Sequence, residues 1–245
     1  MVATGRRAEL AANLVDVRDR ISRAADAVGR SPDDVTLVVV TKTWPADDVV
    51  TLAELGVTDV GENRDQEAAP KAAAVASVLA SRPGAWSLRW HFVGQLQSNK
   101  VRSVVSYADV VESVDRPKLV RVLDRAVLES ARSSGGPLPC LVQVGLDPVP
   151  GRGGAPPAEV SQLAAAVAGA EGLELAGLMA VAPLGADPDE AFARLATIAE
   201  RVRRDHPGAR VLSAGMTDDL EQAVRHGATH VRVGRAVLGR RPAVG

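Results

Sequence analysis

A lysine closes a continuous apolar run near the start of the chain. The run, VTLVVVTK, spans residues 35–42, and its β-branched residues are typical of a strand buried on both faces of a parallel sheet. Lys42 ends this strand, and Pro45 with the aspartates behind it predicts the start of a helix. Parallel α/β proteins place their chemistry at the carboxyl ends of strands, so Lys42 is a candidate reactive amine. The alternative is that its side chain simply reaches water.

The last two predicted strands carry groups that could hold an anion. They are followed by the segments SAGMTDD (213–219) and THVRVGR (229–235), which combine hydroxyls with glycine. Ser213, Thr217 and the bare backbone of Gly234 lie at or near predicted helix N-termini, where amide donors and the helix dipole favour a phosphate. For Thr217 the alternative is an ordinary helix cap.

The last strand also positions an arginine. Alternation along a strand places Val231 and Val233 on one face and His230 and Arg232 on the other. If the valines contact the helices, Arg232 points into the sheet interior, where its burial requires a carboxylate or a ligand. Exposure at the strand end is the alternative.

A lysine, an arginine and a phosphate-binding turn would then lie together at the same end of the sheet. The same alternation groups Lys42 with the inward residues Val38 and Val40. A desolvated lysine beside positive charge has a lowered pKa and can form a Schiff base. An aldehyde, a phosphate and a partner for a ring nitrogen together indicate pyridoxal 5′-phosphate (PLP).

The elements that must position these residues alternate between strand and helix. An amphipathic helix is predicted over residues 6–29, and eight strands follow with helices between them. The predicted strands span 35–42, 57–63, 88–94, 108–115, 140–146, 173–181, 211–216 and 229–234. No composition break divides the chain, so the pattern predicts one (β/α)8 TIM-type barrel domain over 1–245, with the N-terminal helix (1–30) packed on it. A doubly wound open sheet is the alternative.

The composition excludes several classes of protein. The 245 residues are 46% hydrophobic, enough for a large core, and the net charge of −1 offers no electrostatic case for nucleic acid or an anionic membrane. The single cysteine, Cys140, excludes an internal disulfide, and the sequence shows no clustered metal ligands. The N-terminal MVATGRRAEL lacks an apolar signal core, so we expect a cytoplasmic protein. Because the metal-ligating residue types are not clustered, we also expect no bound metal.

The chain resembles the pyridoxal 5′-phosphate homeostasis protein family, the single-domain relatives of alanine racemase. The matching stretches lie within residues 35–239 and read VVVTKTWP, GENRDQE, WHFVGQLQSNK, GLMAVAP and LSAGMTDDLEQAVRHGATHVRVGRAVLG. The resemblance implies a barrel that holds PLP as a Schiff base on Lys42. It also implies that Asn63 and His91 lie beside the ring, Met179 and Ser213 near it, Met216, Thr217, Thr229 and Gly234 around the phosphate, and Arg232 opposite the pyridine nitrogen.

Several of these residues have alternative interpretations on sequence grounds alone. His91 is equally typical of a packed core histidine, and Asn63 of a helix cap. The segment QSNK (97–100) is either a phosphate turn or a helix start. The segment VQVGLDPVPGRGG departs from the family pattern, which leaves the role of the 147–157 loop open.

The resemblance implies a binding and homeostasis module, a monomer that limits free PLP and hands it, with other B6 vitamers, to apo-enzymes. An amino-acid racemase is the alternative, and a non-covalent sugar-phosphate binder is a third. Two-base racemisation requires a second acid or base opposite Lys42. Alanine racemases take it from a tyrosine in a separate C-terminal domain. Here the only tyrosine, Tyr107, precedes the fourth predicted strand, and the sequence ends at Gly245 after the last barrel unit. We therefore expect little or no racemase activity.

Overall fold

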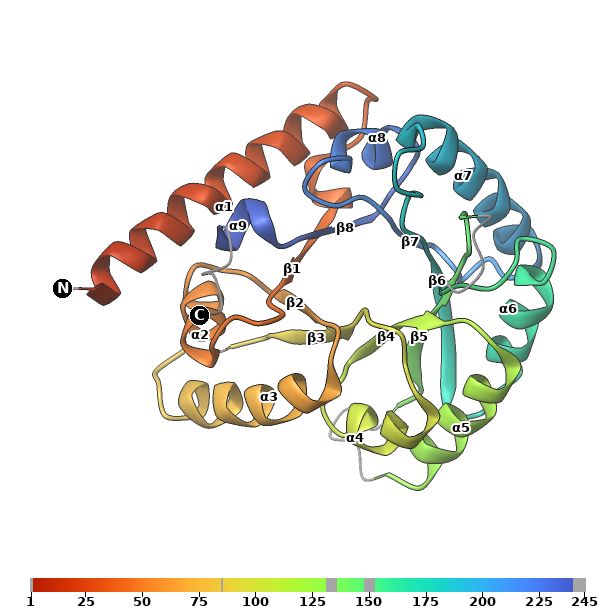
Figure 1. Cartoon of the computed structure of the whole chain (residues 1–245), viewed down its shortest axis with the longest axis horizontal. Coiled ribbons are helices and arrows are strands. Elements are labelled where there is room, and N and C mark those ends of the chain that lie inside the picture. Colours follow the sequence, from red (N-terminus) through yellow and green to blue (C-terminus); the bar gives the residue numbers. More distant parts are fainter. Residues whose placement is uncertain (1, 85, 131–135, 148–152, 240–245) are drawn as a thin grey trace.

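The computed structural model describes residues 2–84, 86–130, 136–147 and 153–239. Eight parallel strands pair in chain order, and the last pairs with the first to close a barrel. Figure 1 looks into this barrel, with the helices arranged around its outside. The closed sheet confirms the (β/α)8 prediction and excludes the open doubly wound sheet.

The strands are shorter than the apolar runs that predicted them. They are β1 (Thr36–Val40), β2 (Asp59–Glu62), β3 (Arg89–Phe92), β4 (Val110–Val114), β5 (Leu138–Gln143), β6 (Leu173–Met179), β7 (Val211–Ser213) and β8 (His230–Val233). Apolar residues continue past the last ladder hydrogen bonds into the βα loops, which explains the difference. Lys42 therefore lies in the loop two residues beyond β1.

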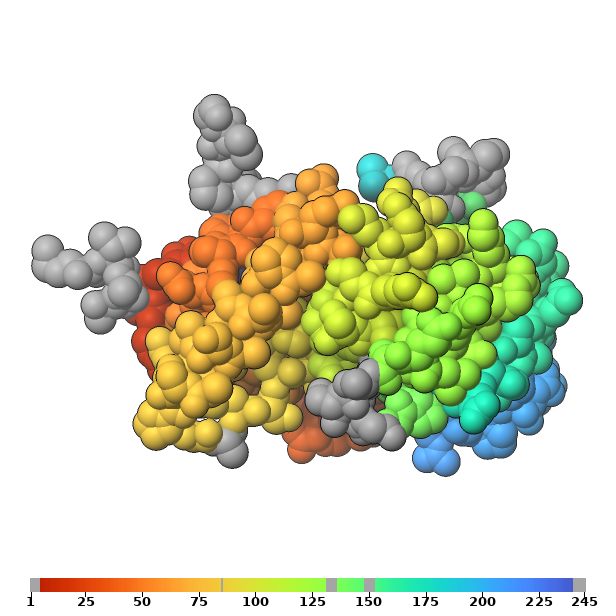
Figure 2. Space-filling model, turned by 90° about the horizontal axis from the view of Figure 1, so that it is seen from below, coloured from red at the N-terminus to blue at the C-terminus, as the bar shows by residue number. Residues whose placement is uncertain are grey.

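The helices form the outer layer. They are α1 (Val2–Asp26), α2 (Ala46–Glu54), α3 (Asp65–Ala80), α4 (Val101–Val105), α5 (Pro117–Leu128), α6 (Val160–Ala168), α7 (Pro188–Asp205), α8 (Leu220–Arg225) and α9 (Arg235–Leu238), with 3₁₀ turns η1 (Pro32–Asp34) and η2 (Ser98–Lys100). Figure 2 shows α3, α4 and α5 side by side as one outer wall. The predicted end of the fifth helix near Ser133 and most of the 147–157 loop fall outside the described residues.

The N-terminal helix packs on the barrel as predicted. α1 lies along α8 and α9 at the outside of the sheet (Figure 1). Its buried face joins the outward valines of β8 in one apolar cluster, whose members on α1 and β8 are Leu10, Leu14, Val17, Ile21, Ala24, Ala25, Val231 and Val233. No helix in the described ranges is long and apolar enough to cross a membrane.

The barrel interior is polar. Asp59, His91, Glu112, Ser213 and Arg232 are each at most 5% exposed, and they come from five different strands. Barrel interiors are usually filled by branched apolar residues. Burial of charged groups costs desolvation free energy, so each of them requires a partner inside the barrel. The fold maintains these groups in spite of that cost.

Candidate functional site

A pocket of about 620 Å³ opens at the carboxyl ends of β1 and β8. Five of the residues predicted from the sequence line it, namely Lys42, Met216, Thr217, Arg232 and Gly234. Its remaining lining comprises Val40, Trp44, Asp218, Arg235 and Gly239. The pocket therefore lies at the strand ends where barrel proteins place their chemistry.

The loop that carries Lys42 has an unusual backbone. Thr43, the next residue, has a φ of 69°, in the left-handed region that β-branched residues rarely adopt. Its amide donates to Oε2 of Glu67 at 3.3 Å, so the first turn of α3 helps to hold this turn. Strain of this kind persists only where surrounding structure fixes it, and it clusters at functional sites.

The residue on the other side of Lys42 is fixed as well. The hydroxyl of Thr41 donates to Oε1 of Glu62 at 2.7 Å. The ammonium of Lys71 donates to the same carboxylate oxygen at 2.6 Å and to the carbonyl oxygen of Thr41 at 2.9 Å. This buried cluster behind the loop was not predicted from the sequence. The sequence feature that could have indicated this cluster is the GENRDQE stretch, which supplies Glu62 before the start of α3 and Glu67 just after it.

Glycines bring the backbone close to the edge of the pocket. A Cβ atom on Gly215, whose φ is 88°, would lie 2.6 Å from the side chain of Ala223. A Cβ on Gly234 would lie 3.1 Å from the carbonyl oxygen of Val40. Only residues without a side chain fit comfortably at these two positions. Gly215 is buried, whereas the half-buried Gly234 lines the pocket and presents bare main chain that an anion could approach.

Thr217 is not the cap of the helix that follows it. α8 begins at Leu220 with Asp219 in the N-cap position. The carbonyl oxygen of Thr217 accepts a hydrogen bond from Arg20 of α1 at 2.8 Å, so the N-terminal helix braces this loop. Thr217 is also one of the residues that line the pocket. The helix-cap alternative for Thr217 is therefore wrong.

Arg232 points into the barrel, as strand alternation predicted. Its Nη1 donates to Oγ of Ser213 at 2.7 Å, and its Nη2 donates to the carbonyl oxygen of Ala180 at 2.8 Å. Oε2 of Glu112 lies 3.7 Å from Nη1 and supplies the expected carboxylate. Burial lowers the pKa of Arg232, and the charge of Glu112 opposes that effect. The alternative of an exposed arginine is excluded by its 5% exposure.

His91 lies within the barrel wall of β3, with both ring nitrogens engaged. Nδ1 is 2.7 Å from Oε1 of Glu112, and Nε2 is 2.9 Å from Oδ1 of Asp59. Burial alone would lower the pKa of His91, but its bonds to the two carboxylates raise it to about 9. Burial would raise the pKa values of Asp59 and Glu112, but their hydrogen bonds together with the positive charges of His91 and of Arg89 or Arg232 lower both to about 2. Both ring nitrogens of His91 are therefore engaged by carboxylates, and His91 is not among the residues that line the Lys42 pocket.

Thr229 lies at the wrong end of its strand for a phosphate contact. It precedes His230, the first residue of β8, whereas Gly234 follows the last residue. Its hydroxyl accepts from the amide of Leu212 at 2.9 Å and lies 2.9 Å from Nδ1 of His230. This corrects the sequence-based expectation, because the hydroxyl supports the amino end of the β7–β8 pair instead.

The other predicted residues lie near strand ends without lining the pocket. Met179 and Ser213 are the last residues of β6 and β7, are paired in register, and are fully or almost fully buried. Asn63 follows β2, and its Oδ1 is buried with no hydrogen-bond partner among the described residues. The N-cap position of α3 is Arg64, so Asn63 is not the cap. A buried acceptor without a donor is costly unless a ligand supplies one.

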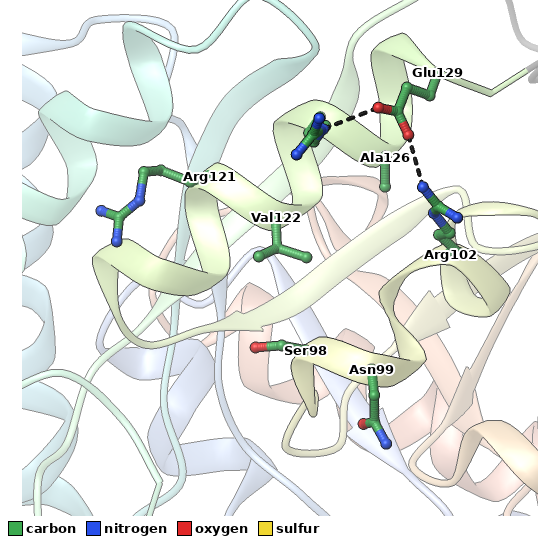
Figure 3. Close-up of a pocket in the computed structure, with 8 residues that line it drawn as sticks. Ser98, Asn99, Arg102, Arg121, Val122, Ala126 and Glu129 are labelled. Atoms are coloured by element: carbon green, nitrogen blue, oxygen red, sulfur yellow. Dashed lines mark hydrogen bonds and ion pairs between the residues drawn. The ribbon is translucent and has the colours of Figure 1, made fainter.

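A second hollow of about 620 Å³ lies outside the barrel between η2–α4 and α5. Glu129 accepts from Arg102 at 3.0 Å and from Arg125 at 2.9 Å. Figure 3 shows Arg121 directed away from Glu129. None of the predicted site residues lines this hollow. The QSNK segment forms the 3₁₀ turn that leads into α4, which favours the helix-start interpretation. Among the described residues, no cluster of metal-ligating side chains is present.

Comparisons with known proteins point to one family. A family model described as "Alanine racemase, N-terminal domain" matches residues 12–242. The pyridoxal phosphate homeostasis protein of Mycobacterium leprae is 46% identical, over 96% of this chain and 93% of that protein. The protein of the same name from Escherichia coli K12 is 36% identical, over 95% of this chain and 97% of that protein.

Solved structures extend the similarity to three dimensions. PipY of Synechococcus elongatus, solved with PLP bound, is 31% identical with a TM-score of 0.77, over 94% of this chain and 100% of PipY. Alanine racemase of Corynebacterium glutamicum is 14% identical with a TM-score of 0.66, and the match covers 98% of this chain but 62% of the racemase. The second likeness is one of fold alone.

Proposed function

Because this chain belongs to the pyridoxal phosphate homeostasis protein family, we propose that it binds PLP and takes part in intracellular PLP homeostasis. The observation that carries the proposal is the joint presence of Lys42, Arg232 and Gly234 on one pocket. An amine, a cation and exposed main chain are the groups that an aldehyde, a ring nitrogen and a phosphate require.

The residues present fit the cofactor. Lys42 would hold it covalently through its amine, and Arg232 would face the pyridine nitrogen. Met216, Thr217 and Gly234 would surround the phosphate, where the glycine backbone has room only for a bare Cα. Asn63, Met179 and Ser213 would lie near the ring. The buried Oδ1 of Asn63 has no hydrogen-bond partner among the described residues, so it could accept a hydrogen bond from a ligand there.

Arg232 also bears on the kind of chemistry to expect. PLP supplies an electron sink for carbanions when its ring nitrogen is protonated. A guanidinium stays protonated in proteins and only donates, so Arg232 would keep that nitrogen unprotonated. The site therefore suits storage and release of PLP better than racemisation, and the likeness to alanine racemase is distant.

The finer aspects of the proposal concern partners and location. We propose that the chain forms one PLP-binding domain, acts as a monomer in the cytoplasm, and hands PLP and other B6 vitamers to apo-enzymes. The names of its relatives support a role in PLP supply. No part of the proposal requires a metal or nucleic acid.

One purified sample tests the main proposal. We expect the protein to absorb in the near-visible after incubation with PLP, and borohydride to fix the cofactor irreversibly. Mass mapping of the modified peptide should identify Lys42. Absence of any such band at saturating PLP, with the protein folded by circular dichroism, would overturn the proposal and favour a non-covalent sugar-phosphate binder.

A further inference from the structure

A chain of alternating charges crosses the barrel interior. It consists of Arg232, Ser213, Glu112, His91 and Asp59, and we call it the interior ion chain. Each link is short: Arg232 to Ser213 at 2.7 Å, Ser213 to Glu112 at 2.6 Å, Glu112 to His91 at 2.7 Å, and His91 to Asp59 at 2.9 Å. One end lines the pocket of Lys42, and the other reaches the opposite mouth of the barrel.

The geometry of His91 favours the imidazolium form. Each ring nitrogen lies within 2.9 Å of a carboxylate oxygen, one from Glu112 and one from Asp59. A neutral imidazole donates from one nitrogen only, so its second nitrogen would present a lone pair to a carboxylate lone pair. Donation from both nitrogens removes this repulsion and balances the two negative charges, at a site that is 2% exposed.

Glu112 connects His91 to the pocket. Its Oε1 faces His91, while its Oε2 accepts from the Ser213 hydroxyl and lies 3.7 Å from the Arg232 guanidinium. Both carboxylate oxygens are therefore engaged, and the side chain has no freedom to rotate without losing a bond on one side. The carbonyl oxygen of Ala180 fixes the second Nη of Arg232. Arg232 is thus held by three neighbours.

The far end of the interior ion chain is anchored too. Asp59 accepts from Thr58 at 2.7 Å, and its Oδ1 lies 2.8 Å from Arg89, whose side chain is half exposed. This anchor keeps Asp59 ionised beside His91, which in turn keeps Glu112 in place. Charges alternate along the whole line, so removal of one member leaves its neighbours buried without a counterion.

We infer that Glu112 is a positioning residue that, braced by His91, orients the Arg232 guanidinium toward the cofactor ring, both by its charge and through the Ser213 hydroxyl, which donates to Glu112 and accepts from Arg232. The inference rests on the proposed function, since without PLP there is nothing to orient. It assigns His91 to a charge-balancing role inside the barrel, away from the cofactor. Glu112 acts on the cofactor through Arg232 and does not contact it.

Two substitutions separate charge from shape. Glu112→Gln keeps the size of the side chain and an oxygen that accepts from Ser213, but it removes the counterion of Arg232. Glu112→Asp keeps the charge, but its side chain is one carbon too short to reach both His91 and Ser213. The exposed Glu129→Gln, at the C-cap position that follows α5 outside the barrel, is the matched control for loss of one carboxylate.

The readout is the pH dependence of the bound cofactor's absorbance. In Glu112→Gln the uncompensated charge of Arg232 disfavours a proton on the covalent linkage to Lys42. The pH midpoint of the absorbance change should therefore fall by about one unit or more. Glu112→Asp should give a smaller shift, and Glu129→Gln none. A folded protein with merely weaker packing would not move this midpoint.

A second measurement uses the apo-protein and does not depend on PLP. The chain has four histidines, so nitrogen NMR can assign His91 readily. The charged groups that face its ring are Asp59 and Glu112, with His230, Arg89 and Arg232 nearby. Both ring nitrogens of His91 should carry protons at pH 7.5 in the native protein. In Glu112→Gln, His91 should lose one proton at lower pH.

The outcomes distinguish this inference from the proposed function. If wild type and Glu112→Gln share the same midpoint and the same PLP affinity, the positioning role is overturned and PLP binding stands. If wild type shows no PLP band, both fall. Should Glu112→Gln fail to fold, Glu112→Asp must shift the midpoint in the same direction, because its shorter side chain loses contact with Ser213 and Arg232. An unshifted midpoint there also overturns the inference, as does a singly protonated His91 in the native protein.

Discussion

The ammonium group of Lys71 lies 2.6 Å from Oε1 of Glu62, behind the loop that carries Lys42. Its side chain is 9% exposed and also donates to the carbonyl oxygen of Thr41. An amine that is engaged by a buried carboxylate and a carbonyl oxygen is not directed at a ligand. The two lysines near this loop therefore have different roles: Lys71 fixes the backbone, and Lys42 faces the pocket.

We predict that Lys42 is the sole covalent attachment point. Lys42→Ala should leave a folded barrel that has lost the near-visible band. Lys71→Met should keep the band but lose about 3 kcal/mol of unfolding free energy, since Glu62 is left buried without its cation. The exposed Lys118→Ala is the control and should change neither property. Borohydride-fixed cofactor on Lys71, Lys100 or Lys118 in the native protein would contradict this assignment.

We predict that Thr217 and Thr229 behave differently. Loss of a charge-assisted hydrogen bond costs roughly 1.5–3 kcal/mol, so Thr217→Ala should weaken PLP binding by about ten- to a hundredfold. Thr229→Ala should leave affinity unchanged and lower stability by about 1 kcal/mol, because the Leu212 amide loses its acceptor. Spectral titration and thermal melts measure the two effects. Equal loss of affinity in both variants would refute the placement of the phosphate.

The stability of the apo-protein should fall as pH rises above neutrality. Ion pairing raises the pKa of His91 from 6.5 to about 9. Its contribution, about 3 kcal/mol, is fully present below pH 6.5 and is lost as pH rises through 9. Burial lowers the pKa of His230 to about 4, so its titration reduces stability only as the pH falls below about 6.5. Urea unfolding between pH 6 and 9.5 should show this decline, and His91→Gln should flatten it.

At acid pH the stability of the apo-protein should fall as the pH is lowered. The pKa values of Asp59 and Glu112 are lowered to about 2, so their contributions are present above the normal range of carboxyl groups. Those contributions are lost as pH falls from about 4 through 2. Glu112→Gln should therefore reduce the steepness of acid unfolding. Identical acid transitions in the variant and the native protein would show that Glu112 is not ionised inside the barrel.

Local sequence patterns predicted the fold, and sequence analysis also predicted five of the ten residues that line the pocket. Continuous apolar runs alternating with amphipathic segments predicted the barrel, and strand alternation predicted the inward direction of Arg232. Both rest on short-range periodicity, which the sequence shows directly. The phosphate contact of Thr229 was implied by the family resemblance alone, and the structure places Thr229 before the first residue of β8.

The interior ion chain could not be predicted in the same way. Asp59, His91 and Glu112 lie on three neighbouring strands, and their contacts depend on the register between those strands. Sequence analysis also gives no distances between the side chains of different elements, so it could not predict the partners of the buried carboxylates. In the structure Glu62 bonds to Lys71 and Asp115 to Arg116.

Finally, we predict that the protein is a poor racemase or none. The reaction removes the α-proton on one face of the cofactor and returns one on the other, so it needs a second acid or base opposite Lys42. Among the described residues that line the pocket, the only carboxylate is Asp218, which is exposed and ion-paired with Arg235. Burial raises the pKa of Tyr107, and the side chain packs among the apolar residues of the barrel wall.

We therefore expect no significant exchange of the α-proton of alanine or serine in deuterated water, followed by NMR with the PLP-loaded protein. Arg232 contributes to this expectation, because an unprotonated ring nitrogen stabilises a carbanion poorly. An alanine racemase assayed in parallel provides the positive control. Exchange on the order of 1 per second or faster, abolished in Lys42→Ala, would overturn the binding-module proposal and establish a racemase.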